Sequence, residues 1–188
     1  MPTKLITAPT VEPITVAEVK QRLGVTHSDL DTDFAAWIVA AREAAEQITG
    51  RALAPQTWEK VLDAFPENEI ALPWPPLTAI TWVKYTDTDG TLQTLADTVY
   101  TLDNDSEPGW LLLAYDQDWP ETQDTANAVR VRYTCGYANA AAVPATIKQW
   151  LHLQVGQSYA HREAGAERPV SAHDFTRGLL DRYTLLAV

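Results

Sequence analysis

A hydroxyl, an imidazole and a carboxylate lie close together in this sequence, at Ser171, His173 and Asp174. In a hydrolase triad, a base takes the proton of a nucleophile and a carboxylate orients the base. Those three groups must meet across a fold, however, and Ser171 followed by Asp174 three residues later is also the pattern of a helix cap. We therefore interpret the cluster as a helix start, and we expect that the protein is not an enzyme.

Metal binding is the second chemistry that the side chains could support. His152 and His161 are nine residues apart, which places them about half a turn out of phase on a helix, so they cannot share a metal ion. The acidic groups at 87–90 and 103–107 contain fragments of a calcium loop but lack its remaining ligands. The single cysteine, Cys135, excludes an internal disulfide and a CxxC zinc site. We expect no metal and no cofactor.

Four tryptophans in the middle of the chain offer aromatic faces on which a sugar or a base can stack. They are Trp74, Trp82, Trp110 and Trp119. Core packing explains most of them equally well, so a glycan-binding or other ligand-binding module is an alternative function. Quenching of tryptophan emission by a glycan or by single-stranded DNA would favour it.

The elements that must position these residues change type at two places. Residues 1–55 and 141–188 have helical spacing, whereas residues 56–140 form short apolar runs bounded by Pro, Gly, Asn and Asp. We expect an α+β fold in which the N-terminal and C-terminal helices form a helical bundle body. The segment 56–140 is expected to be an inserted antiparallel β-sheet or small β-sandwich module, because no helix-length segments separate its strands.

The N-terminal helices carry start and stop signals. Thr15 followed by Glu18 predicts a capping box, and Gly24 and Gly50 can adopt the left-handed conformation that ends a helix. The second helix is expected to open near residue 28 or 29. Its predicted core-facing stripe is Leu30, Phe34, Trp37, Ala41, Ala45 and Ile48. Its predicted opposite face holds Asp33, Arg42, Glu43, Glu46 and Gln47.

The clearest strand signal lies at 129–135, where apolar residues alternate with Arg130, Arg132 and Thr134. This period of two predicts a half-buried strand in which Cys135 points inward as an inert thiol. The other predicted strands are Trp58–Leu62, Ile80–Tyr85, Leu92–Leu95, Val99–Leu102 and Trp110–Tyr115. Asp89-Gly90 predicts a hairpin turn.

The acidic charge is concentrated in the predicted β module. The whole chain has a net charge of −11, and residues 51–140 contribute five Lys and Arg against fourteen Asp and Glu. Such a surface repels the phosphate backbone within a Debye length of about 10 Å, so tight DNA binding through it is not expected. It either aids solubility or faces DNA without gripping it. The sequence contains no predicted membrane span and no signal peptide, and we expect a protein made in the cytosol.

The C-terminal part is predicted to contain a helix after Pro144 and another from Ser171. The chain then ends in an unusually apolar stretch, which should dock either on the chain's own core or on a partner protein. The apolar residues of this tail are Phe175, Leu179, Leu180, Tyr183, Leu185 and Leu186.

An ordered series of short motifs spans nearly the whole chain. The motifs are Ile14-Thr15-Val16-Ala17-Glu18-Val19-Lys20 with Leu23-Gly24-Val25, Thr49-Gly50-Arg51-Ala52-Leu53, Gln56-Thr57-Trp58-Glu59, Ile70-Ala71-Leu72-Pro73 with Pro75-Pro76-Leu77, Asp87 with Asp89-Gly90, Gly136-Tyr137, Val143-Pro144, Ile147-Lys148, Tyr159 and Arg162-Glu163. In this order they resemble the phage head–tail connector (head-completion or adaptor) proteins. The resemblance is to the long variant with a β insertion that is found in prophages and gene transfer agents.

The resemblance implies a structural protein of the virion. Such adaptors form a homo-oligomeric ring, typically a dodecamer, between the portal protein and the tail-side neck or stopper proteins. DNA passes through the ring without specific binding. The implied location is the capsid vertex or neck, after assembly in the host cytoplasm and without a membrane. We expect the tail residues named above to contact the portal. Another neck component, such as a stopper or a tail-terminator, is the nearest alternative.

Overall fold

The computed structural model describes residues 3–67, 69–161 and 174–185, with side chains of the last helix described from residue 178. The chain has an α+β fold divided into two compact units. The first, which we call the β unit, comprises Met1–Pro9 and Pro55–Gly136. The second, the helical unit, comprises Thr10–Ala54 and Tyr137–Val188. No helix in the described part of the chain is long and apolar enough to cross a membrane.

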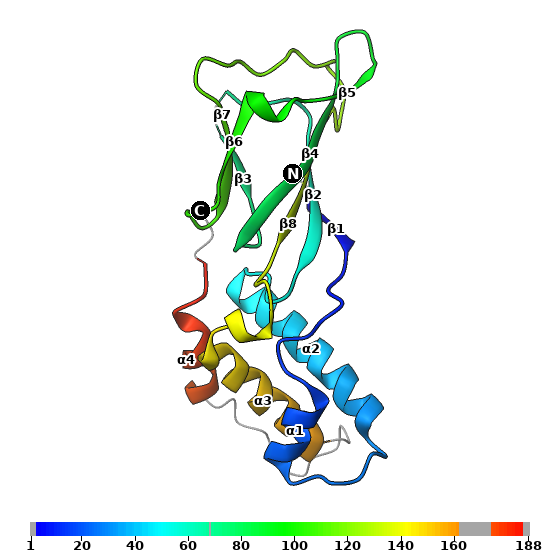
Figure 1. Ribbon diagram of the computed structural model, residues 1–188, viewed down its shortest axis with the longest axis vertical. Coiled ribbons are helices and arrows are strands. Elements are labelled where there is room, and N and C mark those ends of the chain that lie inside the picture. Colours follow the sequence, from blue (N-terminus) through cyan, green and yellow to red (C-terminus); the bar gives the residue numbers. More distant parts are fainter. Residues whose placement is uncertain (1–2, 68, 162–173, 186–188) are drawn as a thin grey trace. The chain divides into compact units, whose positions relative to one another are not determined.

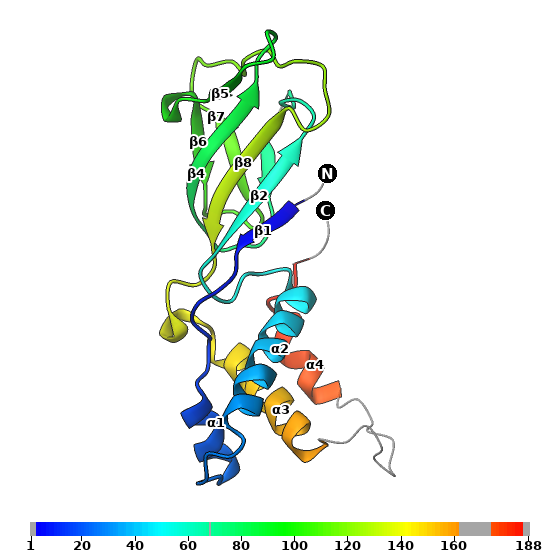
Figure 2. The same cartoon turned by 90° about the vertical axis from the view of Figure 1, so that its right-hand side faces the viewer.

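The β unit consists of two antiparallel sheets (Figure 1, Figure 2). The larger sheet has the strand order β1-β2-β8-β4-β5 and the smaller has the order β3-β7-β6. The strands of the larger sheet are β1 (Thr3–Thr7), β2 (Gln56–Leu62), β8 (Val129–Cys135), β4 (Leu77–Thr86) and β5 (Leu92–Thr94). Those of the smaller sheet are β3 (Ile70–Leu72), β7 (Gly109–Leu113) and β6 (Tyr100–Asp103), which follows the short 3-10 helix η1 (Asp97–Val99).

The core of the β unit lies between the two sheets. Val129, Val131 and Tyr133 of β8 are fully buried, as are Leu72 and Leu111 of the smaller sheet. The two-residue period of β8 therefore places one face of this strand in the core, as its sequence predicts. Cys135 is also buried, which confirms that its thiol points inward.

The helical unit contains α1 (Val16–Leu23), α2 (Asp31–Thr49), α3 (Ala145–Ala160) and α4 (Asp174–Asp181), with a short 3-10 helix η2 (Ala140–Ala142) before α3. The capping box of Thr15 and Glu18 is confirmed, and Gly24 and Gly50 end their helices at φ 70°. Residues from all four helices share one core, which includes Phe34, Ile147 and Leu180. These four helices cannot be stable singly, because each buries its apolar face only against the others.

Several local expectations differ from the structure. Residues 3–7, assigned to the helical part, form strand β1, and 70–72 form strand β3. In α2 the buried positions after Ala45 are Glu46 and Thr49, whereas Ile48 is 44% exposed. With 3.6 residues per turn, the buried residues of α2 centre near Ile38 and Ala45, so the buried face is rotated relative to the predicted stripe and Ile48 falls at its edge. Arg42 and Glu46, both predicted on the exposed face, are 5% and 7% exposed.

Candidate assembly surfaces

The structure describes only some of the residues that the sequence offers for an active or metal site. Ser171 and His173 lie outside the described residues, and Asp174 is described only as backbone of α4. His152 lies within α3 and His161 follows its last turn. Among the described residues, no three His, Cys, Asp or Glu side chains are grouped in a way that could hold a metal ion.

The two acidic groups that contain calcium-loop fragments are turns stabilised by their own aspartates. The Asp87 carboxylate accepts hydrogen bonds from Gln93 Nε2 and from the Thr91 and Asp89 N–H groups, at 2.8, 2.8 and 3.1 Å. The Asp103 carboxylate accepts from the N–H groups of Asp105 and Ser106, at 3.0 and 3.2 Å. The bond from Gln93 and those from the backbone hold the pKa of Asp87 below its usual value. Turn geometry therefore accounts for both aspartates.

The four tryptophans considered as a stacking platform do not share one surface. Trp74 stacks on Trp58 with ring centroids 4.9 Å apart, and Trp119 stacks on Phe65 at 4.8 Å. Trp110 lines a cavity of about 500 Å³. The side chains around that cavity come mainly from β2, β3 and the segment between them, and include Lys60, Leu62, Phe65 and Ile70. Trp82 lies elsewhere, among basic side chains of the larger sheet.

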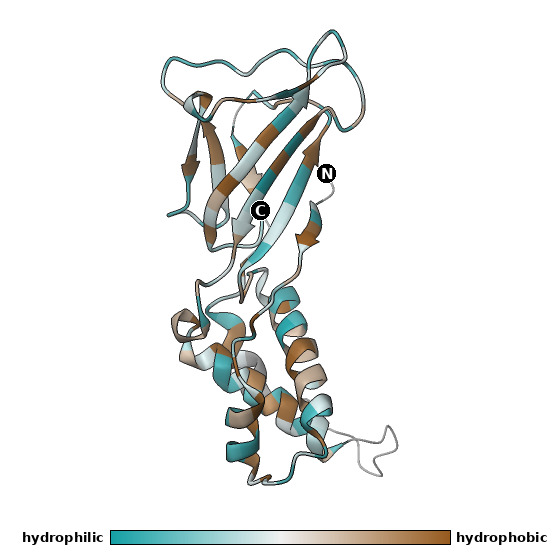
Figure 3. Cartoon of the chain, turned by 45° about the vertical axis from the view of Figure 1, so that its right-hand side comes forward, coloured by the Kyte–Doolittle hydropathy of each residue, from teal (hydrophilic) through white to brown (hydrophobic). Residues whose placement is uncertain are grey.

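Basic side chains gather on the outward face of the larger sheet. Arg130 and Arg132 alternate with the buried residues of β8 and so point away from the core. Strand register places Lys84 opposite Arg130, and Glu59 opposite both Arg132 and Lys4. Directly paired residues of antiparallel strands share a face. Hydropathy accordingly alternates along these strands (Figure 3). We call this surface, made of Lys4, Glu59, Trp82, Lys84, Arg130 and Arg132, the basic face.

The basic face is organised around one buried acid and one tryptophan. Glu59 is 4% exposed, and its carboxylate lies 2.7 Å from Arg132 Nη2 and 3.6 Å from Arg130 Nη1. The Arg132 guanidinium lies 4.6 Å from the centre of the Trp82 ring, and Lys84 Nζ lies 4.8 Å from it. Both distances are within the range of a cation–π interaction. The single carboxylate leaves this face with an excess of positive charge.

A second feature of the β unit is the acidic loop, which we define as residues 115–124. It follows β7 of the smaller sheet and carries the exposed acids Asp116, Asp118, Glu121 and Asp124. At its start the N–H of Gln117 donates to the Ala114 carbonyl at 3.2 Å, and Asp116 has φ 59°. This turn leaves Tyr115 99% exposed. The loop therefore presents an aromatic ring next to carboxylates.

The C-terminal tail is attached to its own helical unit. Leu180 is 1% exposed within the core, and Leu179 and Tyr183 pack against that core. Arg51 Nε donates to the Tyr183 carbonyl at 2.7 Å, and the Leu185 N–H donates to the Thr49 carbonyl at 2.9 Å. The side chain of Phe175 and the whole of Leu186 lie outside the described part of the chain. For the described tail residues, docking on the chain's own core is the arrangement that the structure has.

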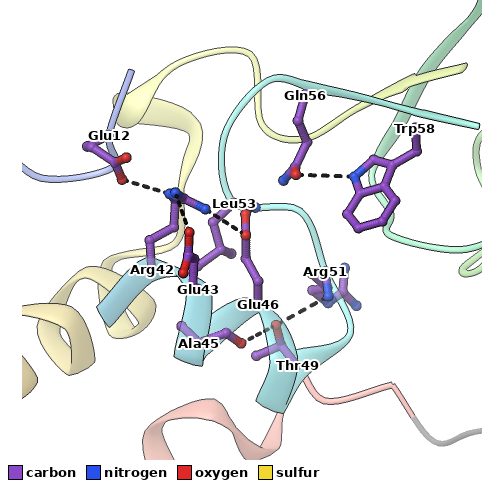
Figure 4. A network of polar contacts seen from close by, with 10 residues as sticks. All are labelled: Glu12, Arg42, Glu43, Ala45, Glu46, Thr49, Arg51, Leu53, Gln56 and Trp58. Carbon is purple, nitrogen blue, oxygen red and sulfur yellow. Dashed lines mark hydrogen bonds and ion pairs between the residues drawn. The ribbon is translucent and has the colours of Figure 1, made fainter. Parts of the chain in front are cut away.

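A buried ionic network fixes the end of α2 (Figure 4). Arg42 Nε lies 2.8 Å from Glu12, and Arg42 Nη1 lies 2.8 Å from Glu46. The other Glu46 oxygen accepts the Leu53 N–H at 2.8 Å. Burial raises the pKa of Glu12. Burial opposes the charge of Arg42, but the carboxylates of Glu46 and Glu12 outweigh it and hold the pKa of Arg42 above its usual value.

No protein-family model and no curated protein matches the sequence, but several solved structures match the fold of the chain. A chain in the neck of an empty gene transfer agent particle, computed with C6 symmetry, superposes with a TM-score of 0.83 at 23% identity, covering 100% of this chain and 97% of that chain. The chain shares the fold of that neck chain.

Two further structures give the same result. One is the virion of a native gene transfer agent particle, with a TM-score of 0.79, and the other is the neck of a native particle computed with C12 symmetry, with a TM-score of 0.75. Both matches have 24% identity and again cover 100% of this chain and 97% of that chain. The likeness therefore includes both units and is not limited to one of them.

The basic face was not predicted from the sequence, because it forms only when the strands of the larger sheet are aligned in register. The alternation of Arg130 and Arg132 was visible, but Lys4 and Lys84 join them only after β1, β2, β8 and β4 are aligned. The burial of Arg42 was also missed. The partner that neutralises it, Glu12, lies 30 residues away in sequence, and no local pattern predicts such a contact.

Proposed function

We propose that this chain is a head–tail adaptor, a structural virion protein that forms a homo-oligomeric ring between a portal and tail-side neck proteins. The observation that carries the proposal is the full-length likeness to a neck chain, with a TM-score of 0.83. The ordered motifs of the sequence support the same assignment independently of the fold. In this role the protein acts by binding, with no catalysis, and needs no cofactor.

A ring is supported by the symmetry of the neighbours and by the surfaces of the chain. The two similar necks were computed with C6 and C12 symmetry, and we propose a dodecamer for this chain. A closed ring requires two different complementary patches on each subunit, because its contacts are head-to-tail. The basic face and the acidic loop of the β unit are two such patches of opposite charge. DNA passes through the ring unbound, which agrees with the net charge of −9 on the β unit.

We place the portal contact on the C-terminal tail. Leu180 is buried in the helical core and serves the fold there. Leu179, Tyr183 and Leu185 are only partly buried, so part of each apolar side chain is available to a partner. Together with Phe175 and Leu186 they form the proposed contact. Its location is the neck of a particle assembled in the host cytoplasm.

Particle imaging tests the assignment. Virions that carry this chain, examined by electron microscopy, should show it as a ring next to the portal. A position further along the neck would assign it instead as a stopper or tail-terminator, and its absence from purified virions would refute a structural role.

Point variants test the tail. The double substitution Leu179→Gln with Leu185→Gln should leave a folded chain that no longer joins portal-bearing heads, since it makes the proposed contact polar but spares Leu180. The matched control is Val39→Gln with Ile48→Gln, which alters two exposed apolar residues of α2 that are 37% and 44% exposed. Circular dichroism checks folding in each case. Normal joining by the tail variant would remove the tail from the portal contact.

A further inference from the structure

The charges of the β unit are segregated. It contains five basic residues against fourteen acidic ones. Four of the five, Lys4, Lys84, Arg130 and Arg132, lie on the basic face. The fifth, Lys60, is on the other side of the sheet, where its Nζ donates to the Ala71 carbonyl. All but one of the fourteen acids lie off the basic face, so the unit presents one basic surface and a largely acidic remainder.

We propose that the basic face binds the acidic loop of a second copy of this chain. This rests on the proposed ring and names the contact that joins its β units. Tyr115, with Asp116 and Asp118 beside it, would lie against Trp82, Lys84 and Arg130 of the neighbouring copy. Such pairing places opposite charges in contact. It also brings together Arg, Trp and Tyr, which are the side chains enriched at the energetic centres of interfaces.

The two surfaces can be used at once because they share no residue. The basic face is on the larger sheet, whereas the acidic loop starts after β7 of the smaller sheet and reaches the end of β4, where the Gln123 N–H donates to the Thr86 carbonyl at 3.1 Å. Each copy can therefore give its loop to one neighbour and offer its face to the other, which is the head-to-tail arrangement of a ring. The exposure of Tyr115 supports this use, because a phenol ring that is 99% exposed contributes no burial to its own fold.

The charge pattern favours a protein partner over DNA. Glu59 occupies the centre of the basic face, where it lies 2.7 Å from Arg132 and partly neutralises it. A long polyanion that reached this face would also meet the acids of the surrounding surface, whose repulsion extends over about 10 Å. A loop of four acids is short enough to contact the face alone.

Complementary charge reversal tests the contact in the full-length protein. The face variant carries Lys84→Glu and Arg130→Glu, and the loop variant carries Asp118→Lys and Glu121→Lys. Self-association is measured by sedimentation equilibrium at low salt, up to millimolar protein. Each variant alone should associate at least about tenfold more weakly than the unchanged chain. An equal mixture of the two should recover association, because the unchanged basic face of the loop variant meets the unchanged acidic loop of the face variant, and the two new lysines of the altered loop meet the two new glutamates of the altered face.

Two controls match these changes in charge. Asp89→Lys with Asp105→Lys alters two exposed acids of the β unit outside the acidic loop, and Arg22→Glu with Lys148→Glu alters two basic residues of the helical unit. Both should associate like the unchanged chain. Circular dichroism and thermal melting verify that every variant is folded.

Several results would overturn the contact. They are association of the face or loop variant at the unchanged strength, failure of the mixture to recover, and an unchanged chain that stays monomeric throughout. Tight binding of a 20-base-pair duplex, lost in the face variant, would make the face a DNA site instead. Imaging of the particle neck decides the proposed function separately, so a chain that sits in the neck but associates regardless of these charges refutes the contact alone.

Discussion

Replacing Arg42 with methionine should strongly destabilise the helical unit. The Arg42 side chain is 6% exposed and has carboxylate oxygens of Glu12 and Glu46 at 2.8 Å each. Methionine keeps most of the apolar stem but leaves two carboxylates without their counter-charge. Breaking a buried pair by removing one partner costs about 3–5 kcal/mol.

The individual partners indicate where that cost arises. The Glu46 side chain is 10% exposed, so it should account for most of the loss, whereas Glu12 at 24% can recover some hydration. Glu43, at 3.6 Å and 62% exposed, should contribute at most about 1 kcal/mol. We therefore expect a loss of about 3–4 kcal/mol.

Urea unfolding followed by circular dichroism at 222 nm measures this change, with an unchanged slope as evidence that unfolding exposes the same surface. The control is Glu46→Gln, which removes the charge but retains an oxygen for the Leu53 N–H. The double variant should lose less than the sum of the two single losses, because the charge that Arg42 neutralised is partly gone. A loss below about 1 kcal/mol for Arg42→Met would contradict the assignment of this network as a buried support.

Two further predictions concern the two units separately. In the β unit, Gly109→Ala should lower the free energy of unfolding by about 1–3 kcal/mol, because an added Cβ would lie 2.9 Å from the Asp103 carbonyl oxygen. An unchanged melting temperature would show that β6 and β7 can move apart to accept the methyl group. In the helical unit, burial first and then the charge of Arg22 hold the pKa of His152 below its usual 6.5. The folded state therefore takes up this proton less readily than the unfolded chain, so stability that is fully present above pH 6.5 is lost as pH falls from there through the lower pKa of the folded state. His152→Gln should flatten that loss, as measured by urea unfolding across this range; an unaltered pH slope would exclude His152 as its source.

The elements with local signals were predictable from sequence. The α1 cap depends on Thr15 and Glu18, which are three residues apart, and the β4–β5 hairpin turns at Gly90 with φ 80°. Strand β1 was not predictable, because Thr3–Thr7 becomes a strand only by pairing with β2, whose paired residues lie at least 50 positions later. The candidate surfaces likewise divide into those with a local sequence signal and those that depend on long-range contacts. The acidic character of the loop is evident in composition, but the basic face requires four strands in register, and the burial of Leu180 requires the assembled helical core.

The chain passes from one unit to the other three times, after residues 9, 54 and 136. Neither unit is thus a continuous stretch of the gene, and neither can be excised by a single truncation. During synthesis the last strand of the β unit, β8, is made before α3 and α4. At that stage the helical segment 10–54 is joined to the β unit at both of its ends. Its apolar residues, such as Phe34 and Ile38, have no packing partners from α3 and α4. A chain truncated after residue 140 should consequently be a good chaperone substrate, although it contains every strand of both sheets.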